Sequence, residues 1–264
     1  MNGNIMASLP GTPRHTRCLE QEAQARRDLA IAYRLFDMLG ITDLIHTHIS
    51  IRVPGEEGAF LQLPYGHLFS EARASDMVKC DIGGNILSDP TGLGVSRGGF
   101  CIHSAIHQAI PRAACVMHAH TEANIAVASY REGLLPLSQH ALRFYGKIGY
   151  LDYCGPFDTE EKRRRLPVAL GGGDVLMLRN HGALVIGQSV AECYSRMYYL
   201  ERACRMQVTM LSMCRDARAE LVFPAVEDCA TMARLFEDPE QSVAQREWVA
   251  LTRRLDDQGA DYAR

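Results

Sequence analysis

The sequence predicts an α/β domain with a central sheet and helices on both of its faces. Segments with the helical spacing of apolar residues alternate with short runs that have a strand pattern, and turns rich in glycine and proline separate them. Hydrophobic residues make up 47% of the 264 residues, which is enough to build a sizeable core. Because no internal repeat or low-complexity tract divides the chain, we expect a single large domain.

The first expected elements are a helix and a hairpin. Residues 21–39 carry apolar side chains at helical spacing, and Gly40 ends the helix because glycine readily takes the left-handed backbone conformation. Residues 44–53 form a predicted strand. A Pro-Gly turn then returns the chain through a second strand at residues 59–63.

A further strand, a turn, a loop and a helix follow. Residues 75–80 have a strand pattern, and residues 81–85 make a glycine-containing turn after it. Residues 89–99 are rich in glycine and are predicted to form a loop. Residues 100–110 then form an amphipathic helix that Pro111 stops.

The second half continues the alternation of short strands and helices. We expect strands at residues 113–117 and 175–178, and helices at residues 123–129, 158–170 and 190–213. The tail from residue 228 to residue 264 is polar and helical in character. Such a tail packs on the domain surface or on a neighbouring subunit.

Charge and composition exclude several classes of protein. The net charge of -3 argues against a nucleic-acid partner, which would call for a basic surface. No apolar stretch approaches the roughly 20 residues that cross a membrane, so we expect no membrane partner. The nine cysteines form no Cys-x-x-Cys pair, and the N-terminus has no apolar signal core. These features predict reduced thiols in a cytoplasmic protein.

Three histidines form the most informative pattern. His118 and His120 end an apolar run, and side chains two apart in a strand point to the same face. His181 follows a second apolar run and precedes Gly182, which allows a sharp turn. Three imidazoles of this kind make a face for a divalent metal that leaves positions open for water or substrate, as a catalytic site requires. The alternative is that they are ordinary polar residues at strand ends.

The order and spacing of several motifs resemble those of the class II aldolase/adducin family. The resemblance runs from about residue 17 to residue 211. It rests on the helix at 21–39, His-Ile-Ser-Ile-Arg at 48–52, Leu-Pro-Tyr-Gly at 63–66, the hairpin at 77–87, the helix containing His103, His118-Ala-His120, Asn180-His181-Gly182 and the long helix that follows.

The resemblance implies a three-layer α/β/α fold with a central, largely antiparallel sheet. It also implies a homotetramer with each active site near a subunit interface, and His118, His120 and His181 as ligands of a divalent metal ion. Zinc is the first expectation for that ion, with iron(II) or manganese as alternatives. We expect a flexible N-terminal arm at residues 1–16, the family domain at 17–222 and a helical C-terminal extension at 223–264.

Two departures from the sugar-phosphate aldolases of this family affect the expected chemistry. Those aldolases carry a glutamate, which is metal ligand and catalytic base, four residues before the helix histidine; here that histidine is His103 and the matching residue is Gly99. They also hold the substrate phosphate with a Gly-Asn-x-Ser turn, where this chain has Thr47, His48, Ile49 and Ser50. The chain therefore resembles an adducin-like bacterial branch that keeps the histidine triad without the glutamate.

The remaining residues favour a metal-dependent lyase that breaks a carbon–carbon bond next to a carbonyl, through a metal-stabilised enolate. Aldol cleavage and decarboxylation share that intermediate, but decarboxylation needs no base to remove a hydroxyl proton. Loss of the glutamate is thus more compatible with decarboxylation. The substrate would be a small carbonyl compound or acid. His140 or Tyr145 would supply a proton, unless both are simply hydrogen-bonded in a packed segment.

Two other functions stay open. Three histidines with open positions also suit iron(II) and dioxygen, and members of this superfamily in aminocoumarin antibiotic pathways perform oxidative decarboxylation of aryl-pyruvates. A hydroxy-acid is a second possible substrate for such an oxygenase. Adducin head domains, in contrast, keep the fold as non-catalytic interaction modules. Retention of the whole triad argues against that third reading.

Four further residues have expected roles near the metal. His48 lies where the family grips its substrate, and Ser50 and Arg97 are able to bind an acidic substrate group. The alternatives are sheet structure for Ser50 and a solvated charge for Arg97. His103 begins a helix that faces the triad in the family pattern. We expect it to orient a metal ligand from behind and not to bind the metal itself.

Overall fold

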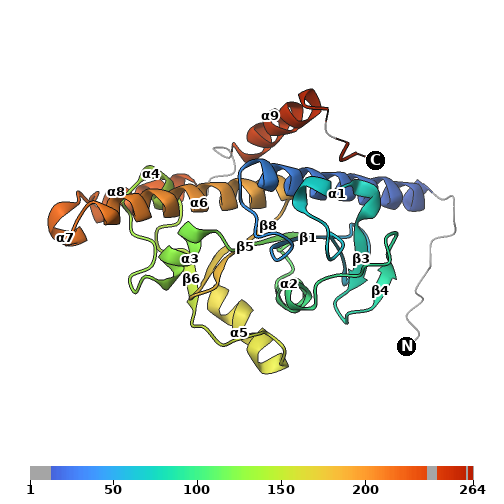
Figure 1. Ribbon diagram of the computed structural model, residues 1–264, viewed down its shortest axis with the longest axis horizontal. Helices are drawn as coiled ribbons and strands as arrows, with labels where there is room; N and C mark the ends of the chain where they lie inside the picture. Colours follow the sequence, from blue (N-terminus) through green and yellow to red (C-terminus); the bar gives the residue numbers. More distant parts are fainter. Residues whose placement is uncertain (1–12, 237–242, 260, 264) are drawn as a thin grey trace.

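The computed structural model describes residues 13–236, 243–259 and 261–263, and it confirms the α/β prediction (Figure 1). Within these residues a single sheet has the strand order β4-β3-β2-β1-β5-β8-β7-β6. Neighbouring strands are antiparallel except for the parallel pair β6 and β7. The strands are β1 (His48–Arg52), β2 (Ala59–Gln62), β3 (Val78–Asp81), β4 (Ile86–Ser88), β5 (Cys115–Ala119), β6 (Ile148–Leu151), β7 (Val175–Leu178) and β8 (Gly182–Gly187).

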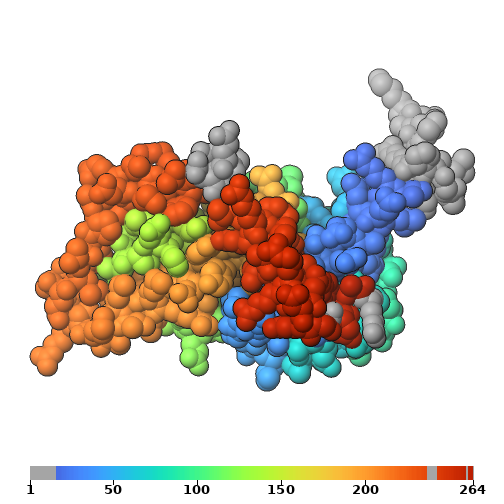
Figure 2. All heavy atoms as spheres, turned by 90° about the horizontal axis from the view of Figure 1, so that it is seen from above, coloured from blue at the N-terminus to red at the C-terminus, as the bar shows by residue number. Residues whose placement is uncertain are grey.

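Helices cover both faces of the sheet, which gives the expected three layers (Figure 1). One face packs against α1 (Pro13–Met38), α3 (Glu122–Ser129) and α6 (Val190–Ser212), and the other against α2 (Arg97–Ala109) and α5 (Glu160–Leu170). Three short helices complete this part of the fold. Helix α4 (Gln139–Leu142) lies in the connection from α3 to β6 and packs against α6, and α7 (Ala217–Glu220) and α8 (Val226–Leu235) follow α6 in the chain. Helix α9 (Ala244–Asp257) lies across α1 and α6 on the outside, as Figure 2 shows.

Several element boundaries differ from the predictions for local reasons. Helix α1 begins at Pro13, well before the predicted start at residue 21. Its first turns are polar, so the spacing of apolar residues does not reveal them, and proline is favoured at the first position of a helix. The strand expected from residue 44 begins only at His48, since Leu44 has φ of 49°, which no strand residue adopts. Helix α2 begins three residues early because Ser96 caps it by accepting a hydrogen bond from the Gly99 amide.

The expected strand at residues 75–80 is likewise shorter. A 3₁₀ turn at Ala74–Asp76 comes first, and β3 begins at Val78. Residues 1–12 of the expected arm lie outside the described residues, and the boundaries of the arm and of the extension stay predictions. In the part of the chain described here, no helix combines the length and apolar character needed to span a bilayer. All nine cysteines are unpaired thiols.

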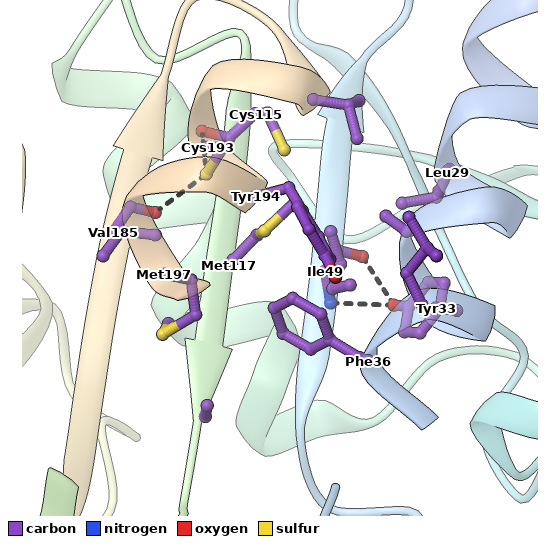
Figure 3. Packing of buried hydrophobic residues seen from close by; sticks show 14 of the residues in the cluster. Leu29, Tyr33, Phe36, Ile49, Cys115, Met117, Val185, Cys193, Tyr194 and Met197 are labelled. Atoms are coloured by element: carbon purple, nitrogen blue, oxygen red, sulfur yellow. Dashed lines mark hydrogen bonds between the residues drawn. The ribbon is translucent and has the colours of Figure 1, made fainter. Parts of the chain in front are cut away.

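One buried tyrosine fixes the strand that carries two of the site residues. The hydroxyl of Tyr33, on α1, donates to the Ile49 carbonyl at 2.6 Å and accepts from the Ile49 amide at 2.8 Å (Figure 3). The same oxygen lies 3.4 Å from the Leu63 amide just beyond β2. The phenol thus satisfies backbone groups where β1 and β2 separate. It holds β1 in place between His48 and Ser50.

Candidate metal centre

The structure brings the three predicted ligand histidines together at one end of the sheet. His118 lies in β5, His120 follows it directly, and His181 lies in the turn between β7 and β8. One ring nitrogen from each side chain lies within 4.8 Å of the other two. The three ring centroids are 4.5, 4.8 and 4.7 Å apart.

Strand alternation explains how the sequence reaches this arrangement. Val116 packs into the core beneath α2 and α5, so His118, two residues later, points to the same face. His48 is the direct partner of His118 across the β1–β5 pairing and therefore shares that face.

The Asn-His-Gly sequence makes the turn that carries His181. Asn180 has φ of 60° and Gly182 has φ of 156°. A Cβ atom at Gly182 would lie only 2.3 Å from the Ala119 carbonyl oxygen. Only glycine fits so close to β5. The close approach therefore brings His181 beside His118 and His120.

The hydrogen-bond partners of two histidines aim lone pairs into the centre. Nδ1 of His118 lies 2.9 Å from the Ala183 carbonyl oxygen, and Nδ1 of His120 lies 3.1 Å from Oδ2 of Asp43. Both partners only accept hydrogen bonds, which places a hydrogen on Nδ1 of each ring, so that Nε2 is the bare nitrogen in the neutral, metal-binding form. The two Nε2 atoms are 2.8 Å apart. At that distance the two nitrogens share either a proton, as a hydrogen bond between the rings, or a bound cation.

Burial keeps the site in the form that binds metals. It lowers the pKa of His118 well below the ordinary value, with His120 and His181 adding to the effect. It lowers the pKa of His181 to about 4, and the repulsion that a protonated His120 would exert is a smaller cause. Neutral imidazoles are the metal-binding form. A set of three nitrogens, two of them oriented by an outer hydrogen bond, therefore fits a divalent transition metal.

A second group of polar side chains lies beneath the site, between β1 and α2. Ser50 is fully buried, and its hydroxyl lies 2.6 Å from Nδ1 of His103 and 2.8 Å from Nε2 of His107. Two imidazoles thus use the Ser50 hydroxyl, and contact of Ser50 with substrate stays a prediction. His103 is also fully buried, and its hydrogen bond goes to Ser50 instead of to a metal ligand.

The position of the missing glutamate is filled by an imidazole. A Cβ atom at Gly99 would lie 2.6 Å from ring atoms of His48. Both ring nitrogens of His48 are buried and have no hydrogen-bond partner among the described residues. The His48 ring packs edge-on against His103, with centroids 6.0 Å apart. Burial lowers the pKa of His48 to about 4, with the charges of neighbouring histidines as smaller causes.

The remaining predicted site residues lie elsewhere on the chain. Arg97 is exposed at the first position of α2. The His140 ring, on α4, packs edge-on against Tyr199 of α6 at 5.1 Å, and burial followed by nearby arginines lowers the pKa of His140. Tyr145 is half-buried in the turn after α4. Proton donation by His140 or Tyr145 stays a prediction, since the His140 ring packs against α6 and not against the triad.

Sequence reasoning missed two residues of the site. His107 lies one helical turn after His103, so the spacing of four already placed both on one helix face. Asp43 gave no comparable signal, because its contact with His120 depends on the loop between α1 and β1.

Comparison with known proteins places this geometry in a family. The family model for the class II aldolase and adducin N-terminal domain matches residues 27–208. The chain belongs to the class II aldolase and adducin family. A relative from Caulobacter vibrioides, which carries a provisional class 2 aldolase name, is 46% identical over 209 residues, covering 79% of this chain and 81% of that protein.

A solved structure and an adducin extend the comparison. The crystal structure of an aldolase II superfamily protein from Pseudomonas syringae superposes with a TM-score of 0.88 at 42% identity, covering 92% of this chain and 96% of that one. Alpha-adducin from Rattus norvegicus is 42% identical over 193 residues, which are 72% of this chain but only 26% of the adducin. All three triad histidines lie inside the matched domain. The family therefore includes both class II aldolases and adducins, and this chain keeps a set of residues able to bind metal.

Proposed function

We propose that this family member is a divalent-metal-dependent carbon–carbon lyase acting next to a carbonyl group, and that it decarboxylates its substrate. The observation that carries the proposal is the convergence of three histidines, two of them held through Nδ1 so that their Nε2 atoms face each other at 2.8 Å. A small 3-oxo acid is the substrate class that fits, because its leaving carboxylate lies one carbon from the carbonyl that accepts the electron pair. The assembly we propose is a homotetramer in the cytoplasm, as the family resemblance implies.

His118, His120 and His181 would hold the ion, with zinc as the first candidate. A bound divalent ion supplies Lewis acidity, which stabilises negative charge on oxygen next to the bond that breaks. The chain itself contributes the orientation of the ligands. The Ala183 carbonyl and the Asp43 carboxylate hold two of the rings in the tautomer that presents Nε2.

The contact between Gly99 and His48 supports decarboxylation over aldol cleavage. Aldol cleavage needs a base to remove a hydroxyl proton, and the space where the family aldolases place a glutamate is occupied here by the His48 ring. In decarboxylation the electron pair of the bond to the leaving carboxylate moves toward the carbonyl, and the carbon then takes up one proton. Such a reaction needs a proton donor after bond cleavage but no base before it.

The test combines metal content with a product assay. Protein purified without oxygen is analysed by inductively coupled plasma mass spectrometry and then assayed for carbon dioxide release from a panel of oxo and hydroxy acids. We expect about one zinc or manganese per chain and release that His118→Ala abolishes. The matched control is His46→Ala, which changes an exposed histidine in the loop before β1. It should retain both the bound metal and the release of carbon dioxide.

The 42% identity to alpha-adducin supports one competing function, a non-catalytic binding module. Protein that takes up no metal after incubation with zinc, manganese or iron(II) would overturn the lyase proposal in its favour. Stoichiometric iron together with dioxygen consumption would overturn it in favour of an oxygenase.

A further inference from the structure

Beneath the triad, His103, Ser50 and His107 form a chain of hydrogen bonds that ends at the Ala113 carbonyl. This carbonyl only accepts, so it fixes which atom donates at each step. Nδ1 of His107 lies 3.1 Å from the Ala113 carbonyl oxygen, so this nitrogen must carry a hydrogen. Burial lowers the pKa of His107 to about 3, with Arg52 as a smaller cause, and the ring is neutral. Its Nε2 is therefore bare and accepts the hydrogen of the Ser50 hydroxyl at 2.8 Å.

The same reasoning sets the tautomer of His103. Ser50 has one hydrogen, which it gives to His107, so at 2.6 Å it must accept from Nδ1 of His103. Burial also lowers the pKa of His103 well below its ordinary value, so that ring is neutral too. Its Nε2 is consequently a bare lone pair. This atom is fully buried and has no partner among the described residues.

The neighbour of that lone pair is His48. The His48 and His103 rings meet edge-on at 6.0 Å, and both ring nitrogens of His48 are unpartnered. Gly99 leaves the space in which the His48 ring lies, one turn before His103 on α2. His48 also stands directly across from His118 in the β1–β5 pairing. The bare Nε2 of His103 and the one hydrogen of a neutral His48 ring are complementary as acceptor and donor.

We infer that His107, Ser50 and His103 form a buried relay that receives the N–H of His48 and turns the other nitrogen of His48, as a bare acceptor, toward the triad. His48 then forms a subsite for a hydroxyl group on the ligand, because a neutral imidazole whose hydrogen is already donated is able only to accept. This inference rests on the proposed function, since it assigns a substrate feature at the same site. It narrows the substrate to a carbonyl or carboxylate compound that carries a hydroxyl.

The relay is tested first by nuclear magnetic resonance of the full chain with ¹⁵N-labelled histidine. Two-bond proton–nitrogen correlations report which ring nitrogen carries the hydrogen. We expect His103 and His107 both to carry it on Nδ1. Ser50→Ala should shift His103 toward the Nε2–H form, because its Nδ1 loses its acceptor, while His107 keeps its hydrogen on Nδ1 against the Ala113 carbonyl. Ser104→Ala, on the same helix as the two histidines, should shift neither ring. Finding the hydrogen on Nε2 of His103 in the unaltered chain overturns the relay.

The subsite is tested with two small acids and a pair of glycine variants. Titration calorimetry of zinc-loaded protein should show glycolate binding about tenfold more weakly to His48→Ala, with acetate, which lacks the hydroxyl, unaffected. Gly99→Ala should weaken glycolate in the same way because its methyl displaces the His48 ring, whereas Gly98→Ala meets no atom within 4 Å and should not.

Equal losses for glycolate and acetate would overturn the hydroxyl subsite. The tautomer measurement needs neither metal nor turnover. A chain that shows the expected tautomers but releases no carbon dioxide therefore contradicts the proposed function alone, and one that is active with the wrong tautomers contradicts the relay alone.

Discussion

The triad and the neighbouring relay of His103, Ser50 and His107 differ in their hydrogen-bond partners. In the triad, His118 donates to the Ala183 carbonyl and His120 to the Asp43 carboxylate, so their Nε2 atoms converge. In the relay, His103 and His107 share one serine hydroxyl, so their polar atoms are used within the protein except for a single nitrogen. In both groups the hydrogen-bond partner of one ring nitrogen determines what the other nitrogen is free to do. That partner therefore decides whether a buried histidine binds a metal or only supports the structure.

Metal removal should give the largest effect and should separate the two groups most clearly. A ligand that binds only the folded chain, at a thousand times its dissociation constant, adds about 4 kcal/mol to the free energy of unfolding. We therefore expect chelation to lower the melting temperature of the unaltered chain but not that of His181→Ala. A drop of the same size in His181→Ala would place the metal outside the triad. Scanning calorimetry with and without chelator measures both.

Loss of an orienting partner should weaken the triad without destroying it. Asp43→Ala removes the acceptor that holds His120, and losses of such outer partners typically cost 10–100-fold in metal affinity. Competition with a chromophoric chelator measures the dissociation constant. Asp37→Ala, an exposed carboxylate near the end of α1, is the control and should leave the affinity unchanged. Equal affinities for the two variants would contradict the role of Asp43.

Loss of the shared hydroxyl should affect stability in the relay. Ser50→Ala leaves two buried imidazole nitrogens unsatisfied, which typically costs about 1–3 kcal/mol for each buried polar group that loses its partner. Ser104→Ala removes a hydroxyl with a single weak bond of 3.5 Å and should cost less. Urea unfolding at pH 8 compares the two, and an equal cost would show that Ser50 holds nothing specific.

The change in the free energy of unfolding per unit of pH is the smallest of these effects. His107 is neutral in the folded chain down to a pH of about 3 but takes up a proton near pH 6.5 when unfolded. Below 6.5 the unfolded state therefore binds more protons. Stability is fully present above that pH and falls by about 1.4 kcal/mol per unit of pH toward 3 for this group. His107→Gln should flatten the slope of urea-unfolding free energy against pH, and an unchanged slope would mean that His107 is charged when folded.

The sequence predicted the fold and the triad better than the relay, for physical reasons. Strand alternation placed His118, and helical spacing placed α6 within one residue, because both depend on local periodicity. The partners of the histidines come from distant loops. Asp43 reaches His120 across 77 residues of sequence, and Ser50 reaches His103 across 53. Such contacts follow only from the folded sheet, so the sequence pattern alone does not reveal that the Ser50 hydroxyl bonds two imidazoles.

Among the described residues, the two with positive φ that are not glycine both adjoin the candidate metal centre. Leu44 follows Asp43 with φ of 49°, and Asn180 precedes His181 with φ of 60°. Such conformations cost free energy for a side chain with a Cβ atom, and leucine is the less suited of the two. Replacement of Leu44 by glycine would remove that cost but widen the range of positions open to Asp43. These two loops therefore lower the free energy of unfolding at the positions where the metal ligands and their partners must be held rigidly. A substitution that raises stability there would also loosen the metal centre.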